Sequence, residues 1–216
     1  MTTIILTTTV TVQDKVYLFQ TDAQERSQVY VKKIKQWLYQ SNFNIVVVEN
    51  TGYTFEELNE EKEKFKDRFE VISYVESELE SANFLKGNPY KGASEVFAIQ
   101  YAYNISPLCQ TANFIIKITG RFFIPHLEEY LKSFDLDEYD VLTQNRTCRC
   151  EMLGCHASHF RIVFNTNLID GNGQYSGNVE DIYQYRCSLF ENKIHCPEFH
   201  IEGTQRGGIN EVFYTI

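Results

Sequence analysis

The chain has 216 residues, of which 43% are hydrophobic and 14% aromatic, and its formal net charge is −9. This length suits one α/β domain, and the apolar content is enough for a sizeable core, which argues against global disorder. The negative charge argues against a protein that follows a nucleic-acid backbone with a basic face. No apolar run approaches the roughly 18 residues that a membrane helix needs, so no membrane span is expected.

Strand and helix patterns alternate from the start of the chain. Residues 1–12 are apolar and threonine-rich without a basic leader, which predicts a buried first strand, no signal peptide and a cytoplasmic location. Residues 27–40 carry apolar side chains at helical spacing and predict a surface helix with one buried stripe. The β-branched run 45–48 predicts a second strand. Strand, helix and strand in this order predict a parallel α/β unit.

The elements that follow continue this pattern as far as residue 140. Beyond it, short strands and turns are predicted, including a strand over 161–164, in an irregular part that is rich in cysteine. No repeat or linker divides the chain, so we predict a single α/β domain over 1–216 with a mainly parallel central sheet. The other predicted elements are a charged helix over 55–69, a strand over 69–75, a helix after 91–95, a strand over 114–121 and a short helix over 127–134.

Polar residues gather where three predicted strands end. Thr7-Thr8-Thr9, Glu49-Asn50 and the stretch 117–121 each follow an apolar run, and Lys91-Gly92 opens a helix. Ligands of open α/β sheets bind at the carboxyl ends of the strands, and helix N-termini favour anions, so these groups are expected to share one cleft. The cations among them suit a diphosphate-bearing ligand. The alternative is that these cations pair with structural carboxylates and that the glycine marks a simple turn.

Five motifs in chain order carry a resemblance to a known family. The most specific pair is the helix start Lys-Gly-x-x-Glu followed by the strand end Lys-x-Thr-Gly-Arg. Over roughly residues 3–135 the chain resembles a GT-A-type family of glycosyltransferases from bacterial surface-polysaccharide clusters and large DNA viruses. The motifs are Leu6-Thr7-Thr8-Thr9, Arg26 with Tyr30, Glu49-Asn50-Thr51-Gly52, Lys91-Gly92-x-x-Glu95 and Lys117-x-Thr119-Gly120-Arg121.

The resemblance implies a GT-A-like, Rossmann-like domain with a nucleotide-sugar-binding half over 1–135 and an acceptor-side half over 136–216. It implies transfer of a sugar from a nucleoside-diphosphate donor to a hydroxyl of a glycan or glycoprotein, in the host cytoplasm if the protein is viral. Glu95 is the candidate for the catalytic carboxylate. The nucleoside is expected at the first two strand ends, and the diphosphate is expected among the cations. The implied donor-binding residues are Thr7, Thr8, Thr9, Arg26, Glu49, Asn50, Lys91, Gly92, Lys117, Thr119, Gly120 and Arg121.

The need for a divalent metal is left open by the sequence. Many GT-A enzymes hold Mn²⁺ or Mg²⁺ with an Asp-x-Asp motif after a central strand, but Lys117-Ile118-Thr119 takes that place here. Lys117 and Arg121 could instead neutralise the diphosphate directly. Asp135-Leu136-Asp137 does spell Asp-x-Asp, but no buried strand precedes it, so a solvated loop is favoured over a metal site.

Six cysteines raise other possibilities for the C-terminal half. Three thiols and two imidazoles fall within residues 148–159, but their spacing matches no standard zinc motif, so free thiols are favoured over structural zinc or disulfides. Two alternative functions stay open: a carbohydrate- or nucleotide-binding module without turnover, and a zinc-stabilised interaction protein. The cysteines are Cys109, Cys148, Cys150, Cys155, Cys187 and Cys196.

Overall fold

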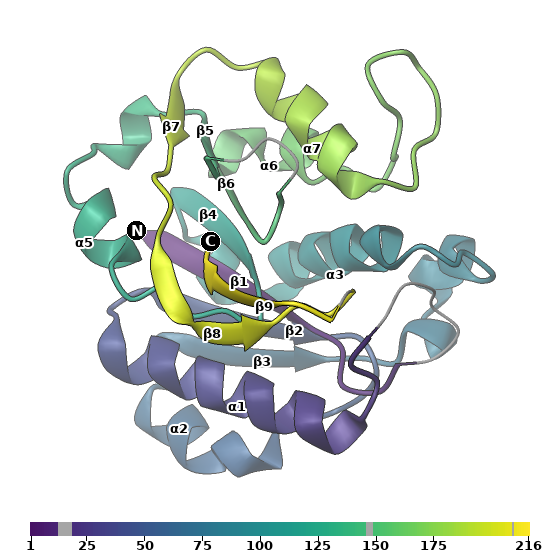
Figure 1. The fold of residues 1–216 in the computed structure, drawn as a ribbon, viewed down its shortest axis with the longest axis vertical. Helices are drawn as coiled ribbons and strands as arrows, with labels where there is room; N and C mark the ends of the chain where they lie inside the picture. Colours follow the sequence, from purple (N-terminus) through teal and green to yellow (C-terminus); the bar gives the residue numbers. More distant parts are fainter. Residues whose placement is uncertain (13–18, 146–148, 209) are drawn as a thin grey trace.

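A seven-stranded sheet forms the centre of the protein in the computed structural model, which describes residues 1–12, 19–145, 149–208 and 210–216. The strands lie in the order β3-β2-β1-β4-β6-β5-β7 (Figure 1). The first four strands pair in parallel, and β6 runs antiparallel to both of its neighbours. The predicted α/β class with a mainly parallel sheet is therefore confirmed. The strands are β1 (Thr2–Thr8), β2 (Asn44–Glu49), β3 (Phe69–Ser73), β4 (Phe114–Thr119), β5 (Val141–Thr143), β6 (Met152–His156) and β7 (Lys193–His195).

Both faces of the sheet are apolar because helices cover both of them. Along β1, Ile4 and Leu6 join the core on one face, whereas Ile5 joins the core on the other. In β2, Val47 and Val46 divide between the two cores in the same way. Side chains alternate along a strand, so the continuous apolar runs in the sequence supply both cores at once.

Two layers of helices pack on the sheet, and a hairpin joins one of them. Figure 1 shows this hairpin, formed by β8 and β9, crossing in front of the central strands. The first layer contains α1 (Ala23–Gln40), α2 (Asn59–Lys64), α5 (Leu127–Leu131) and the hairpin of β8 (His200–Gln205) and β9 (Val212–Thr215); the second contains α3 (Lys91–Ile105), α4 (Pro107–Gln110), α6 (Phe160–Val163) and α7 (Val179–Ser188). Short 3₁₀ helices are η1 (Glu56–Leu58), η2 (Glu76–Glu78), η3 (Glu80–Leu85), η4 (Leu136–Glu138) and η5 (Ala157–His159).

Helix α1 begins earlier than the sequence pattern predicts. Asp22 caps it by accepting a hydrogen bond from the N–H of Glu25 (2.8 Å), so the first turn precedes the amphipathic stripe. Within that stripe, the indole N–H of Trp37 donates to the carbonyl of Phe122 (2.9 Å). This bond ties α1 to the segment that follows β4, next to Arg121.

One predicted strand is a helix. The stretch 161–164 belongs to α6 and the residue after it, because Phe160, Val163 and Phe164 are buried while Ile162 is 48% exposed. This i, i+3, i+4 pattern is helical, but the β-branched residues within it favour a strand when the window is short. The ten-residue helix α7 was also missed by the sequence analysis.

Two other predicted helices are shorter than expected, whereas the helix predicted after 91–95 is present as α3. The charged helix predicted over 55–69 ends at Lys64, and the helix predicted over 127–134 ends at Leu131. Turns follow in both places. Among the residues that the structure describes, no helix combines the length and apolar character needed to cross a membrane.

Candidate functional site

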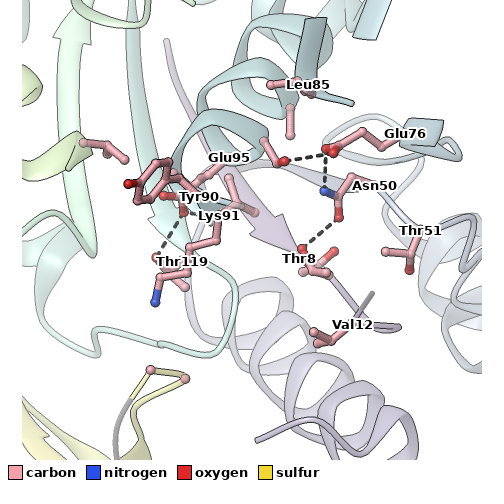
Figure 2. Close-up of a pocket in the computed structure, with 18 of the residues that line it drawn as sticks. Thr8, Val12, Asn50, Thr51, Glu76, Leu85, Tyr90, Lys91, Glu95 and Thr119 are labelled. Carbon is pink, nitrogen blue, oxygen red and sulfur yellow. Dashed lines mark hydrogen bonds between the residues drawn. The ribbon is translucent and has the colours of Figure 1, made fainter. Parts of the chain in front are cut away.

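A cavity of about 1110 Å³ opens at the carboxyl ends of β1, β2 and β4. Thr8, Asn50 and Thr119 mark these strand ends in Figure 2, and the start of α3 adds residues from a fourth side. Residues 177–180 and 206–208, from the C-terminal half, complete the wall. This is the position where α/β sheets bind ligands, and the volume is sufficient for a nucleotide.

The structure brings most of the predicted site residues to this cavity. Glu49, Lys117 and Gly120 are the exceptions, because they are buried beneath its surface. The predicted residues that do line it are Thr7, Thr8, Thr9, Arg26, Asn50, Lys91, Gly92, Glu95, Thr119 and Arg121. Their contact with a ligand stays a prediction.

Hydrogen bonds link three strand ends on one side of the cavity. The hydroxyl of Thr9 donates to Oδ1 of Asn50 (2.8 Å), and the amide of Asn50 donates to Glu76 (3.1 Å). The hydroxyl of Ser94 on α3 donates to the other oxygen of Glu76 (2.9 Å). Figure 2 shows this network on the side opposite to Lys91. The network fixes the orientation of the Asn50 amide at the cavity wall.

Glu49 holds the loops after β1 and β2 in place and does not face the cavity. Its fully buried carboxylate accepts hydrogen bonds from the N–H groups of Val10 (2.9 Å) and Tyr53 (2.8 Å). Both the N–H (2.8 Å) and the hydroxyl (2.5 Å) of Thr51 also donate to it. The expectation that Glu49 lines a nucleoside pocket was therefore wrong, because the protein backbone uses this carboxylate.

Lys117 lies beneath the cavity in an ion pair with Glu95. Alternation along β4 places Lys117 on the same face as Ile115, toward α3, and its Nζ is 2.8 Å from Oε1 of Glu95. Nζ also donates to the carbonyl of Cys150 (2.7 Å), and no part of Lys117 is exposed. The expectation that Lys117 faces a diphosphate was therefore wrong.

The ion pair keeps Glu95 in its charged form. Burial acts to raise the pKa of Glu95, but Lys117 and the hydroxyl of Thr7 (2.8 Å) outweigh it, and the pKa is lowered. For Lys117, burial acts to lower the pKa, and Glu95 outweighs it, so the pKa is raised. In the described part of the chain, the hydrogen bonds to Glu95 all fall on Oε1. A carboxylate with a lowered pKa is a weak base, which suits Glu95 to positioning more than to proton abstraction.

Arg26 lines the cavity and donates hydrogen bonds to other residues of the protein. Its guanidinium donates to the carbonyls of Thr9 (2.6 Å) and Gln20 (2.9 Å) and to the hydroxyl of Tyr30 (2.8 Å). These bonds fix the loop after β1 against α1. Arg26 therefore shapes the cavity wall with three of its five N–H donors.

Close packing explains two of the predicted glycines. A Cβ on Gly120 would lie 2.6 Å from Cγ2 of Thr8, so glycine lets the end of β4 approach β1. A Cβ on Gly92 would lie 1.7 Å from Cγ1 of Val179, so glycine lets the first turn of α3 pack on α7. No side chain caps this turn at Tyr90, which leaves N–H groups of α3 open to the cavity.

Three cations gather at the other side of the cavity. Arg121 is only 8% exposed, its Nη1 is buried, and its guanidinium has no hydrogen bond or ion pair with any described residue. Loss of hydration lowers the pKa of Lys91, and repulsion from Arg121 and Arg206 adds to this shift. Glu95 and Glu180 offset part of it. Burial is thus the main cause of the lowered pKa of Lys91.

The carboxylate nearest to Arg206, that of Glu151, is already paired with another arginine. Arg149 holds Glu151 at 2.7 Å, and Arg206 is its second, more distant partner at 3.8 Å. Glu95 is likewise held by its buried lysine. Positive charge around Arg121 therefore exceeds negative charge, which favours the binding of an anion.

The predicted Asp-x-Asp lies at the wrong edge of the sheet for this cavity. The amide of Asn113, just before β4, donates to Asp137 (3.0 Å), and Asp135 accepts from the N–H of Asp137 (3.2 Å). Within 1–12, 19–145, 149–208 and 210–216, no three His, Cys, Asp or Glu side chains meet as metal ligands do.

The cysteines that the structure describes are free thiols: Cys109, Cys150, Cys155, Cys187 and Cys196. Cys148 lies outside the described residues.

Sequence reasoning missed the cavity residues of the C-terminal half. Arg206-Gly207-Gly208 follows strand β8 just as the other polar clusters follow their strands, and this similarity was the available signal. Glu180 gave no signal, because α7 was not predicted. Glu76 lies shortly after β3, in an acidic stretch that gave no reason to single out one carboxylate.

Comparison with known proteins shows a likeness in fold. No protein-family model and no curated protein sequence matches this chain. The structure is similar to S. aureus TarS 1–349, with a TM-score of 0.50 and 11% identity over 92% of this chain and 59% of that chain. It is also similar to a protein from Desulfovibrio desulfuricans G20 described as a nucleotide-diphospho-sugar transferase, with a TM-score of 0.46 and 15% identity over 91% and 79% of the two chains. This chain thus spans less than two thirds of the TarS fragment, and the shared fold is consistent with the GT-A-like domain expected from the sequence.

Proposed function

We propose that this protein is a glycosyltransferase that binds a nucleoside-diphosphate sugar in the cavity and transfers the sugar to a hydroxyl of a glycan or glycoprotein. The observation that carries the proposal is Arg121, a buried guanidinium without a hydrogen bond or ion pair to any described residue, placed with Lys91 and Arg206 at a strand-end cavity. A buried cation without a partner is costly, and a bound anion removes that cost. The motif resemblance and the fold support the same function.

The two sides of the cavity fit the two parts of a nucleotide-sugar. The network of Thr9, Asn50 and Glu76 offers fixed polar groups for a base and a ribose. Lys91, Arg121 and the uncapped start of α3 offer positive charge and N–H donors for a diphosphate. During transfer, these groups would stabilise the negative charge that develops on the leaving diphosphate.

Calorimetric titration with uridine, UMP and UDP, and with the matching series for the other bases, tests this function. For the preferred base, we expect the diphosphate to bind at least about 10-fold more tightly than the monophosphate, because the cations lie at one side of the cavity. The same titration with Mn²⁺ and Mg²⁺ tests for metal dependence. Absence of any preference for diphosphates would overturn the proposal. Binding without release of the nucleoside diphosphate from any nucleotide-sugar would favour a non-catalytic module.

Glu180 is the carboxylate that we propose as the base for the acceptor hydroxyl. It lines the cavity from the first turn of α7, is partly exposed, and has no hydrogen bond or ion pair with any described residue. Its position near Lys91 places it on the diphosphate side, where the sugar would be attached. A base must be able to take up the proton of the acceptor hydroxyl, and Glu95 is less suited to this because its carboxylate is paired with Lys117.

Replacing Glu180 with glutamine is expected to lower kcat for sugar transfer by about 100-fold, because the amide cannot take the proton of the acceptor. The Kd for the nucleoside diphosphate should stay within about 2-fold of the wild-type value, since the donor does not need this proton transfer. Glu138→Gln, in the 3₁₀ helix η4 outside the cavity, is the matched control. Unchanged kcat in Glu180→Gln would remove Glu180 from the proton transfer.

A further inference from the structure

The segment Arg206–Gly208 reaches the cavity from the C-terminal hairpin. It follows β8, and the N–H of Arg206 donates to the carbonyl of Glu211 (2.9 Å) at the turn. The hairpin is fixed to α1 through Glu202, whose carboxylate lies 2.8 Å from Nζ of the buried Lys33. A part of the chain that is distant in sequence from the strand-end motifs therefore forms one wall of the anion side.

Gly207 packs directly on the guanidinium of Arg121. A Cβ at this position would lie 2.2 Å from Nη1 and 2.5 Å from Nη2 of Arg121, much closer than real Cβ contacts. The φ angle of Gly207 is not positive, so the backbone conformation alone does not call for glycine. Glycine lets the hairpin and Arg121 approach each other this closely, and a larger residue would displace the guanidinium from its present position.

The backbone of this segment has donors to offer. Gly207 and Gly208 both line the cavity, and neither N–H has a hydrogen-bond partner among the described residues. Gly207 is buried, and its carbonyl is used, since it accepts the N–H of Phe19 (2.8 Å). Buried backbone N–H groups are nearly always paired in folded proteins, and an anion bound in the cavity would supply an acceptor for them.

We propose that Arg206–Gly208 completes the anion site, with the N–H groups of the two glycines and the Arg206 guanidinium binding the diphosphate together with Arg121. This inference rests on the proposed function and deepens it, because it assigns part of the donor site to the C-terminal hairpin. Successive backbone N–H groups beside guanidinium groups are a common way for proteins to bind phosphate oxygens. Diphosphate binding and the docking of the hairpin are therefore coupled, and each stabilises the other.

Gly207→Ala tests the inference, with inorganic pyrophosphate, UDP, the other nucleoside diphosphates and the matching nucleosides as probes. The added methyl group displaces Arg121 or the segment, so we expect pyrophosphate and the diphosphate to bind about 10- to 30-fold more weakly. Nucleoside binding should be unchanged, because the Asn50 network lies on the other side of the cavity. Gly203→Ala is the matched control in the same hairpin, where the added Cβ would meet the ring of the exposed Tyr214.

Amide hydrogen exchange provides a second measurement on the wild-type protein. We expect the diphosphate, and not the nucleoside, to slow exchange at 200–208 and 212–215. Equal diphosphate affinity in Gly207→Ala and wild type would overturn the inference and leave the proposed function standing. If Gly207→Ala does not fold, Arg206→Gln decides in its place, with the same loss expected and the same unchanged affinity counting against the inference. Failure of the wild-type protein to bind any diphosphate would instead count against the proposed function itself.

Discussion

Replacing Lys117 with methionine is expected to lower the free energy of unfolding by about 3–5 kcal/mol at neutral pH, because it leaves Glu95 largely buried without its cation. The Lys117 side chain is fully buried and that of Glu95 is 22% exposed, so water replaces the lost partner poorly. The carbonyl of Cys150 loses its donor in the same variant. Chemical denaturation of wild type and variant measures the loss, provided that the dependence of the unfolding free energy on denaturant concentration (the m value) is the same for both proteins.

The double variant Lys117→Met/Glu95→Gln separates the ion pair from the packing of the two side chains. Removal of both charges should restore most of the stability, since an apolar or neutral pair often replaces a buried ion pair at little cost. A double variant no more stable than Lys117→Met would show that the single loss comes from packing. A loss below about 1 kcal/mol in the single variant would contradict the burial of the pair.

The pH dependence of stability gives the same pair a second test. The pKa of Glu95 is lowered in the folded state, so its contribution is complete above about pH 4.3 and is lost as the pH falls through the folded value. The pKa of Lys117 is raised, so its contribution is complete below about pH 10.4 and is lost as the pH rises through the folded value. The difference in stability between wild type and Lys117→Met should therefore be largest between these limits and shrink in acid.

Lys117 also shows which structural features can be predicted from the sequence and which cannot. The apolar run 114–118 predicts a buried strand, and the alternation along it fixes which face each side chain occupies. The depth of the lysine could not be predicted, because it depends on Glu95, which comes from a helix that precedes the strand and packs across it. The same holds for Glu49, which is used by backbone N–H groups of two loops whose course the sequence does not reveal.

The site is predictable where it depends on strand ends, and unpredictable where it depends on the C-terminal half. Thr8, Asn50 and Thr119 meet because parallel strands end at one edge of the sheet, which the order of the elements already implies. Gly207 and Glu180 reach that edge through a hairpin and a helix with weak sequence signals. Their placement depends on how the last third of the chain folds back, and local patterns carry no information on that.

Replacing Arg121 with methionine is expected to change ligand binding and stability in opposite directions. Loss of the guanidinium should weaken nucleoside diphosphate binding by about 2–5 kcal/mol, which is roughly 30-fold to several thousand-fold. The same substitution removes a buried cation that is repelled by Lys91 and has no hydrogen bond or ion pair within the part of the chain that the structure describes. The free energy of unfolding without ligand should therefore rise by about 1–3 kcal/mol.

Arg186→Met is the matched control, because this arginine is also buried but is not part of the cavity lining. Its guanidinium donates to the carbonyls of Val163 (3.1 Å) and Asn165 (2.7 Å), so its removal should lower stability and leave diphosphate affinity unchanged. Denaturation measures the change in stability of each variant, and calorimetry measures its change in diphosphate affinity. We expect stability to rise and affinity to fall in Arg121→Met, and stability to fall with unchanged affinity in Arg186→Met. If Arg121→Met is destabilised and binds diphosphate with full affinity, Arg121 is a structural residue. If the variant is more stable than wild type and no longer binds diphosphate, the role of Arg121 is to bind the ligand, because the protein alone is more stable without this residue.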